Sequence, residues 1–143
     1  MLPKTKENGF TLIEMLFILL ILSLLMVIAV PNLFSLLKKL ETNNFFHMLD
    51  ADIFYIQNEA MDTQNNVRII FREDAYVIRN LYSDEDIIRY YPDNLSYDLV
   101  NNRIMFNKNG TILGPTRYRF FDKNNTYEIV FPLGKGRHYI EKY

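Results

Sequence analysis

The stretch MLFILLILSLLMVIAVPNLFSLL, residues 15–37, contains no charged side chain and consists mostly of Leu, Ile, Val, Phe and Met. As an α-helix rising about 1.5 Å per residue, it would cross a bilayer core of roughly 30 Å. It differs from a secretory signal peptide, because its apolar part is longer and no small-x-small cleavage site follows it. We therefore expect a membrane-spanning helix over residues 10–37, preceded by a short polar leader, residues 1–9.

One acidic side chain interrupts the start of the apolar segment. Glu14 lies four residues after Phe10, where a carboxylate costs a few kcal/mol on membrane-insertion scales. Hydropathy alone favours an uncleaved anchor, but Lys6, eight residues away, is too distant to neutralise the acid there. A cut after Gly9 would create an α-amine at Phe10, and the amine of a neighbouring subunit could pair with Glu14 in an apolar bundle. Glu14 therefore favours a chain that is processed and assembles.

The run GFTLIE, residues 9–14, with a short basic leader before it and an apolar stretch after it, resembles the class III signal of type IV prepilins. The resemblance implies that a membrane peptidase, the prepilin peptidase, cuts between Gly9 and Phe10. It also implies that the same enzyme methylates Phe10 and that Glu14 acts in assembly. Pro31 stands where the helix of this family commonly kinks, and proline removes a backbone donor there.

The orientation in the membrane also rests on this resemblance. Lys4 and Lys6 precede the apolar segment while Lys38 and Lys39 follow it, so the excess of positive charge does not favour either side. The resemblance implies a cytoplasmic leader and a head outside the cell. We therefore expect a single-pass protein of the cell membrane that reaches the cell surface after processing.

The composition limits the classes of function. The 143 residues suffice for one modest domain, which we place at residues 38–143, and the net charge is -1. A charge so close to neutral argues against an electrostatic grip on nucleic acid by the whole protein. Cysteine is absent, so neither a disulfide nor thiolate chemistry is possible.

After Lys38 the pattern becomes amphipathic and then β-like. Apolar residues recur three or four apart over residues 38–61, which places them on one helical face. From Val67 onward the period changes to about 2, and turn residues separate the runs. We expect an α+β protein whose long N-terminal helix lays its second half on an antiparallel β head of about seven strands. The helical face comprises Phe45, Leu49, Ile53, Ile56 and Ala60.

The expected strands are 67–71, 76–81, 87–91, 95–100, 103–106, 118–121, 127–131 and 137–140. The turns include Pro92-Asp93-Asn94, Asn124-Asn125 and Gly134-Lys135-Gly136, and Asn109-Gly110 is the strongest turn signal. Both of its residues tolerate the positive φ that a type I′ hairpin requires.

The head resembles that of the ComGD-type competence pseudopilins, which are minor members of the pilin-like family. The matching stretches are VRIIF, residues 67–71, and YEIVF, residues 127–131, with a Phe106-Asn107-x-x-Gly110 hairpin between them. The resemblance implies a structural subunit of a DNA-uptake pseudopilus. Its implied partners are the prepilin peptidase, sister pilins, a membrane assembly platform, an assembly ATPase and, in one reading, DNA.

Three alternatives stay open at this point. They are a minor pseudopilin of type II secretion, a minor type IV pilin, and a tip subunit that binds DNA. In the last case Arg117, Arg119 and Arg137 are the candidate contacts, because arginines interleave with aromatic residues there. A half-buried strand with its arginines facing solvent explains the same interleaving at Arg117 and Arg119, and we favour that explanation.

No residue pattern predicts an enzyme, a metal site or a cofactor. The two histidines, His47 and His138, lack a metal-ligand spacing and are expected to be structural or at the surface. The acidic run Asp84-Glu85-Asp86 lies next to a turn and is expected to be a solvated loop.

Overall fold

The computed structural model describes residues 9–63, 67–79, 86–132 and 137–143. The chain divides into two compact units, residues 1–37 and residues 38–143, and one helix, α1 (Leu12–Thr63), contributes to both. The expected leader residues 1–8, the turn at residues 134–136, and Asp84 and Glu85 of the acidic run lie outside the described residues. Each unit is described below by itself.

In the first unit α1 is helical through Pro31. Every described residue from 9 to 37 is exposed. The helix is long and apolar enough to cross a membrane.

In the second unit α1 buries one face. Its buried residues include all five that the periodicity predicted, each no more than 3% exposed. Thr42 is buried with them, and its hydroxyl donates to the carbonyl of Lys38 at 2.9 Å and accepts from the Asn94 amide at 3.0 Å.

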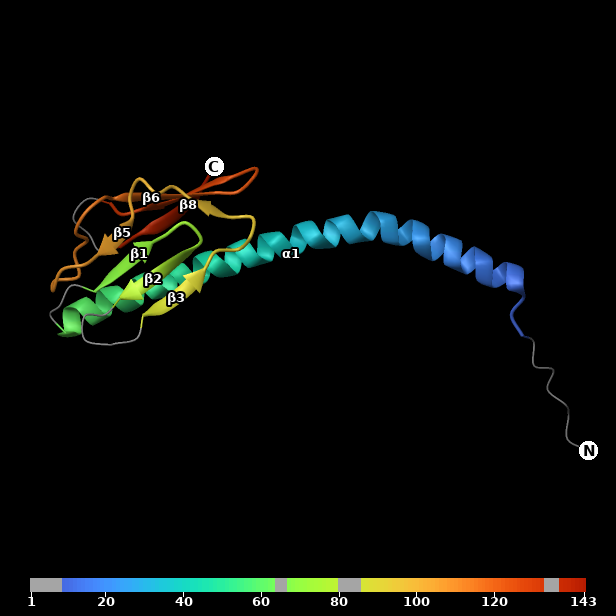
Figure 1. The fold of residues 1–143 in the computed structure, drawn as a ribbon, viewed down its shortest axis with the longest axis horizontal. Helices are drawn as coiled ribbons and strands as arrows, with labels where there is room; N and C mark the ends of the chain where they lie inside the picture. The colour runs from blue at the N-terminus through green and yellow to red at the C-terminus, as the bar shows by residue number, and fades with distance from the viewer. Residues whose placement is uncertain (1–8, 64–66, 80–85, 133–136) are drawn as a thin grey trace, which may run out of the picture. The chain divides into compact units, whose positions relative to one another are not determined.

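Eight strands, labelled in part in Figure 1, form two four-stranded antiparallel sheets within the second unit. The first, sheet A, has the order β3-β2-β1-β5, and the second, sheet B, has the order β4-β6-β7-β8. The strands are β1 (Arg68–Phe71), β2 (Ala75–Arg79), β3 (Ile87–Tyr90), β4 (Ser96–Tyr97), β5 (Arg103–Met105), β6 (Arg117–Phe121), β7 (Thr126–Val130) and β8 (Tyr139–Lys142).

Large aromatic side chains join both sheets to the helix. The ring of Phe45 on α1 contacts Tyr76 of sheet A and Phe120 of sheet B in edge-to-face geometry, with centroids 5.9 and 5.6 Å apart. Such pairs add to the stabilisation that comes from burial itself. One continuous core therefore holds α1, sheet A and sheet B together in the second unit.

The α+β arrangement of a long apolar helix and an antiparallel β head is confirmed, with corrections at the ends of strands. The run 95–100 is a strand only at Ser96–Tyr97, and the last strand begins at Tyr139 rather than at residue 137. Phe106 lies outside β5 and makes an isolated bridge to Ile112. The prediction of longer strands was wrong at Leu95, whose N–H donates to the carbonyl of Pro92 in a turn at 2.8 Å, and at Phe106, which makes a single bridge.

The prediction of a type I′ turn at Asn109-Gly110 was also wrong in detail. The N–H of Gly110 donates to the carbonyl of Asn107 at 2.9 Å, and the N–H of Asn107 donates to the carbonyl of Thr111 at 2.9 Å. Gly110 has φ +70°, so a turn followed by a left-handed glycine closes the loop, as in a G1-bulge hairpin. The Asn107 side chain adds two bonds, from the N–H groups of Asn109 and Thr111.

Candidate functional site

The residues that flank the expected cut lie just before α1. Gly9 and Phe10 are outside the helix and exposed, and Phe10 is 73% exposed. Apart from Gly9 itself and its two chain neighbours, no atom of a described residue lies within 4 Å of the Cβ position of Gly9. The peptide bond between the two residues is therefore not covered by any packing among the described residues.

Thr11 is the N-cap of α1, a role that the sequence analysis missed. Its carbonyl accepts the first helical bond, from the N–H of Met15 at 3.2 Å, and its hydroxyl accepts the N–H of Glu14 at 3.3 Å. Thr11 and Glu14 thus stand in the T-x-x-E spacing of a capping box, and a carboxylate in the first turn also interacts favourably with the helix dipole. Glu14 has a local reason to be acidic in addition to any role in assembly.

The polar side chains inside the apolar segment bond back to their own helix. Ser23 donates to the carbonyl of Leu20 at 2.8 Å, Asn32 to that of Ile28 at 3.0 Å, and Ser35 to that of Asn32 at 2.9 Å. These bonds satisfy hydroxyl and amide donors that would be costly in a lipid environment. The segment therefore presents an almost wholly apolar surface, in which Glu14 is the one ionisable group from Leu12 to Leu37.

The head arginines that we considered as DNA contacts are partly neutralised. Arg117 and Arg119 lie on β6 with exposed side chains, while Tyr118 and Phe120, which alternate with them, are buried in the core. Glu128 on β7 accepts from both arginines, at 2.8 Å from Arg117 and 3.0 Å from Arg119. The favoured explanation, a half-buried strand, is confirmed at these residues.

The alternation of side chains along β7 does not predict that Glu128 is buried, because a carboxylate at an outward-facing position is expected to be exposed. Glu128 is instead only 4% exposed and lies directly opposite Arg119 in the register of β6 and β7. A buried carboxylate needs such partners, because an unpaired buried charge is strongly destabilising.

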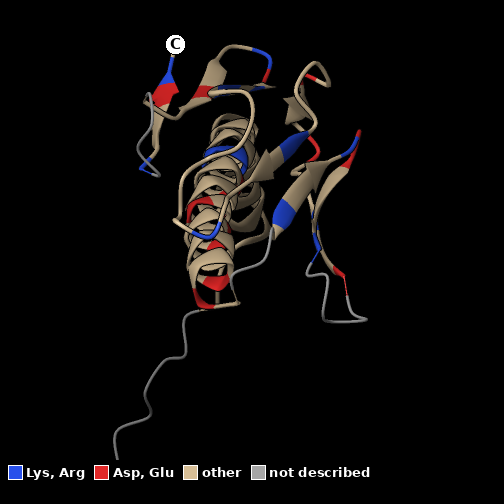
Figure 2. Ribbon diagram, turned by 90° about the vertical axis from the view of Figure 1, so that its left-hand side faces the viewer, with Lys and Arg blue, Asp and Glu red and all other residues tan. Residues whose placement is uncertain are grey.

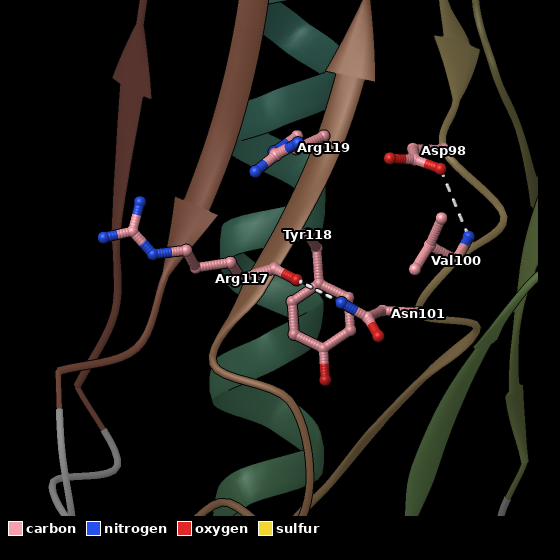
Figure 3. A pocket seen from close by; sticks show the side chains of 6 residues that line it. All are labelled: Asp98, Val100, Asn101, Arg117, Tyr118 and Arg119. Atoms are coloured by element: carbon pink, nitrogen blue, oxygen red, sulfur yellow. Dashed lines mark hydrogen bonds between the residues drawn. The ribbon is translucent and has the colours of Figure 1, made fainter.

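Figure 3 shows the six residues that line a pocket beside Arg117 and Arg119. Asp98, Val100, Asn101 and Tyr118 line a cavity of about 150 Å³ together with the two arginines. Both arginine side chains run toward β7, away from Asp98 (Figure 3), while the Asn101 amide donates to the carbonyl of Arg117 at 3.0 Å. The cavity is thus lined by the carbon chains of the arginines and by the acid Asp98. Such a cavity is a poor site for an anion.

Arg137 and the two histidines do not join these groups. Arg137 lies two residues before β8 and is exposed, and His47 is exposed on α1. His138 is buried against the rings of Phe54 and Phe131, with its Nε2 2.6 Å from Oδ1 of Asp50. Neither ring nitrogen makes a well-directed hydrogen bond. Loss of water contact lowers the pKa of His138, and the nearby Asp50 carboxylate opposes that shift.

Within the described ranges no group of three or more His, Asp or Glu side chains could hold a metal ion. Asp86, the described member of the acidic run, is held by Arg79 instead, with Nη2 to Oδ2 at 2.6 Å and Nε to Oδ1 at 3.0 Å. This fork of hydrogen bonds lowers the pKa of the Asp86 carboxyl.

Comparison with known proteins points to the same N-terminal segment and extends beyond it. The model of the prokaryotic N-terminal methylation motif matches residues 4–30. The competence protein ComGD of Bacillus subtilis is 29% identical over 139 residues, which cover 96% of this chain and 95% of the relative. No solved structure matches the chain significantly.

Proposed function

We propose that this chain, a pilin-like protein of the ComGD type, is a minor structural subunit of a competence pseudopilus. It is inserted in the membrane as a precursor, processed by the prepilin peptidase and added to a filament of sister pilins. The subunit carries out no chemistry of its own. A membrane assembly platform and an ATPase are the partners that would drive its addition to the filament.

The observation that carries this proposal is the start of α1. Within the part of the chain that the structure describes, nothing packs over the Gly9–Phe10 bond, which stands directly before a capped helix with an exposed apolar surface. Cleavage there would leave a free α-amine at the very end of that surface. The capping role of Glu14 would also serve a simple membrane anchor, so the acid supports assembly through its place at the end of an exposed apolar surface, next to the amine that cleavage would create.

Glu14 is the residue on which assembly would depend. As the one ionisable group in an otherwise apolar surface, it can be neutralised in a filament core by the methylated amine of Phe10 from a neighbouring subunit. The leader stays in the cytoplasm and the head faces outward, so that the subunit is delivered to the surface as the filament grows. A bend at Pro31 would let the helix adapt to its neighbours.

The test compares Glu14→Ala with Ser23→Ala in a strain whose own copy is deleted. Ser23 is the matched control because it is polar, exposed and in the same apolar segment. We expect Glu14→Ala to remain in the membrane, to disappear from the filaments sheared off the cell surface and to lower the transformation frequency at least tenfold. Ser23→Ala should behave as the wild type does.

Two results would contradict the proposal. Normal incorporation of Glu14→Ala would refute the role of the acid in assembly. Loss of protein secretion on deletion of the chain, with transformation intact, would instead assign the chain to a type II secretion machine.

A further inference from the structure

One amide side chain in the apolar half of α1 has hydrogen-bonding groups that the function above does not use. Asn32 is exposed, and one of its two amide N–H groups donates to the carbonyl of Ile28 at 3.0 Å. Within the part of the chain that the structure describes, the second N–H and the carbonyl oxygen of this side chain have no partner. Asn32 differs in this respect from Ser23, whose single hydroxyl donor is used by the carbonyl of Leu20.

The position of Asn32 along the helix makes these unused groups costly in a membrane. Lys38, the first charged residue after it, lies six residues further on, or about 9 Å along the helix axis. The short side chain of an asparagine cannot span that distance to reach the membrane surface, as a long lysine side chain does. A polar side chain within a membrane normally faces another helix, where it finds a partner. Asn32 therefore marks the side of α1 that another helix covers.

Asn32 lies on the same side of the helix as Glu14. The two residues are 18 positions apart, which at 3.6 residues per turn is about five whole turns, or roughly 27 Å along the axis. α1 is helical through Pro31, so this count of turns applies across the proline. Ser23 comes nine residues after Glu14, which is about two and a half turns, and lies on the opposite side. The acid and the amide thus define one face of the apolar half.

The residues between Glu14 and Asn32 on this face are aliphatic and recur in alternating steps of four and three. This is the spacing of the a and d positions of a coiled coil, along which parallel helices pack knobs into holes. Asn32 occupies an a position in this frame, and a single asparagine at an a position specifies the register of a helix pair. We call this set of residues the Glu14–Asn32 seam, and its members are Glu14, Ile18, Ile21, Leu25, Ile28 and Asn32.

In the apolar half of α1, charge can fix the position of a partner helix at Glu14 alone. In the second unit α1 carries acidic and basic residues, red and blue in Figure 2, whereas from Leu12 to Leu37 its one charged residue is Glu14. Apolar side chains gain little from one another in lipid, which is itself apolar, so hydrogen bonds between helices help to select the partner. Glu14 and Asn32 give the seam one polar contact at each end, and two contacts fix both the axial position and the rotation of a partner.

The spacing of the two polar residues also distinguishes between partners. If the amine of a neighbouring subunit lies level with Glu14, the partner residue level with Asn32 stands about 18 residues after that amine, because parallel helices rise equally. In a second copy of this chain that residue is Ile28, which comes 18 residues after Phe10 and is apolar. A second copy would therefore leave the Asn32 amide unpaired. A different subunit with an amide or hydroxyl side chain at that position would pair with it.

We propose that α1 packs along the Glu14–Asn32 seam against the apolar helix of a different pilin-like subunit, and that the Asn32 amide fixes the register of this pair. The partner helix carries an amide or hydroxyl side chain about 18 residues after its amino terminus. This inference deepens the function proposed above and rests on it. Glu14 neutralises the amine of whichever subunit is the neighbour, and Asn32 selects which subunit that is.

The test is photocrosslinking in filaments of cells in which the variant replaces the chain's own copy. A benzophenone amino acid at Leu25, on the seam, captures the side chain that packs there. Peptide mass spectrometry of the sheared filaments then identifies the partner and the crosslinked residue. The same label at Ser23, on the opposite side of the helix, is the control for the choice of face.

Three further variants carry the label at Leu25. Asn32→Leu removes the amide, and Asn32→Gln is the conservative variant that keeps an amide. Ser23→Leu is the matched control, because it also replaces a polar side chain of the apolar segment with leucine. Immunoblotting of membranes checks that each variant is inserted to the same level as the wild type.

The wild type labelled at Leu25 should give one main product, formed with a different pilin-like subunit. The crosslinked residue should lie about 11 residues after the amino terminus of that partner, because Leu25 comes 11 residues after Glu14. The label at Ser23 should not give this product. Asn32→Leu should spread its crosslinks over more than one turn of the partner or lower the yield of the main product at least about threefold, because the register is no longer fixed. Asn32→Gln and Ser23→Leu should keep the wild-type position.

Several results would overturn the inference. A main product formed with a second copy of this chain contradicts the choice of partner, and the same product from both labels contradicts the choice of face. No product at Leu25 in filaments that contain the chain also contradicts the seam. An Asn32→Leu variant with the wild-type position and yield, or a Ser23→Leu variant with an equal loss, contradicts the role of the amide. Entry of the unlabelled wild type into filaments tests the proposed function separately, since a chain absent from filaments refutes that function itself.

Discussion

The two halves of α1 are both rich in apolar side chains, yet their surroundings are opposite. From residue 12 to 37 every side chain is exposed, whereas Leu49, Ile53, Ile56 and Ala60 of the second half are completely buried. The second half finds its apolar environment within its own chain. The first half has to find one elsewhere, in lipid or between subunits. The comparison teaches that folding of the head and assembly of the filament are separate events in this molecule.

Removal of residues 1–37 separates the two halves of α1, and we expect it to have the largest effect of the changes considered. We expect the remaining chain, from Lys38 onward, to be soluble and to unfold cooperatively, because the buried core lies entirely within residues 38–143. It should never enter filaments, since it lacks the apolar surface. Near-ultraviolet circular dichroism during thermal unfolding checks the first expectation. A truncated chain without fixed aromatic packing would show that the head depends on the first half of α1.

Ile53→Ala tests the buried half of the helix at one residue. Ile53 is completely buried, and truncation of such a side chain costs about 2–5 kcal/mol of unfolding free energy. Tyr55→Ala, on the same helix but 44% exposed, is the control and should change stability by no more than about 0.5 kcal/mol. Urea unfolding of the chain that starts at Lys38 measures both. Equal effects of the two changes would contradict the assignment of a buried and an exposed face.

The third prediction concerns pH, where the expected effect is smallest. The pKa of His138 is lowered in the folded head, so the unfolded chain binds more protons once the pH drops below about 6.5. His138 therefore leaves the head at full stability above that pH and destabilises it progressively below it. Thermal unfolding at pH 7.5 and at pH 5 should show a lower midpoint at pH 5.

His138→Phe should remove most of that difference, since a phenyl ring can pack between Phe54 and Phe131 without titrating. His47→Gln is the control because His47 is exposed on the same unit, and it should retain the full difference. A wild-type head that is as stable at pH 5 as at pH 7.5 would contradict the burial of an uncharged imidazole.

Local patterns in the sequence predicted the elements but not their cross-strand partners. The period of three to four along residues 45–60 correctly identified the buried face of α1, and the alternation at Tyr118 and Phe120 correctly identified the inward residues of β6. Both patterns follow from the geometry of one element, which a single stretch of sequence contains. The G1-bulge hairpin and the short β4 depend on particular backbone hydrogen bonds. Stretches of similar sequence can form different backbone hydrogen bonds, so the sequence pattern does not predict them.

The arginines show the same limit at the level of function. The sequence drew attention to Arg117 and Arg119, because aromatic residues interleave with them, and gave no sign that Glu128 pairs with both. Glu128 lies opposite Arg119 in the register of β6 and β7. Register between distant strands decides which guanidinium groups are neutralised, and register cannot be read from one strand.

The most direct test of the central claim is the intact mass of the protein purified from membranes of cells that contain the prepilin peptidase. The proposed processing predicts the mass of residues 10–143 plus one methyl group, with the methyl on the α-amine of Phe10. Cells without the peptidase should yield the mass of residues 1–143. A mature protein that keeps residues 1–9 in the presence of the peptidase would show that α1 is an ordinary membrane anchor.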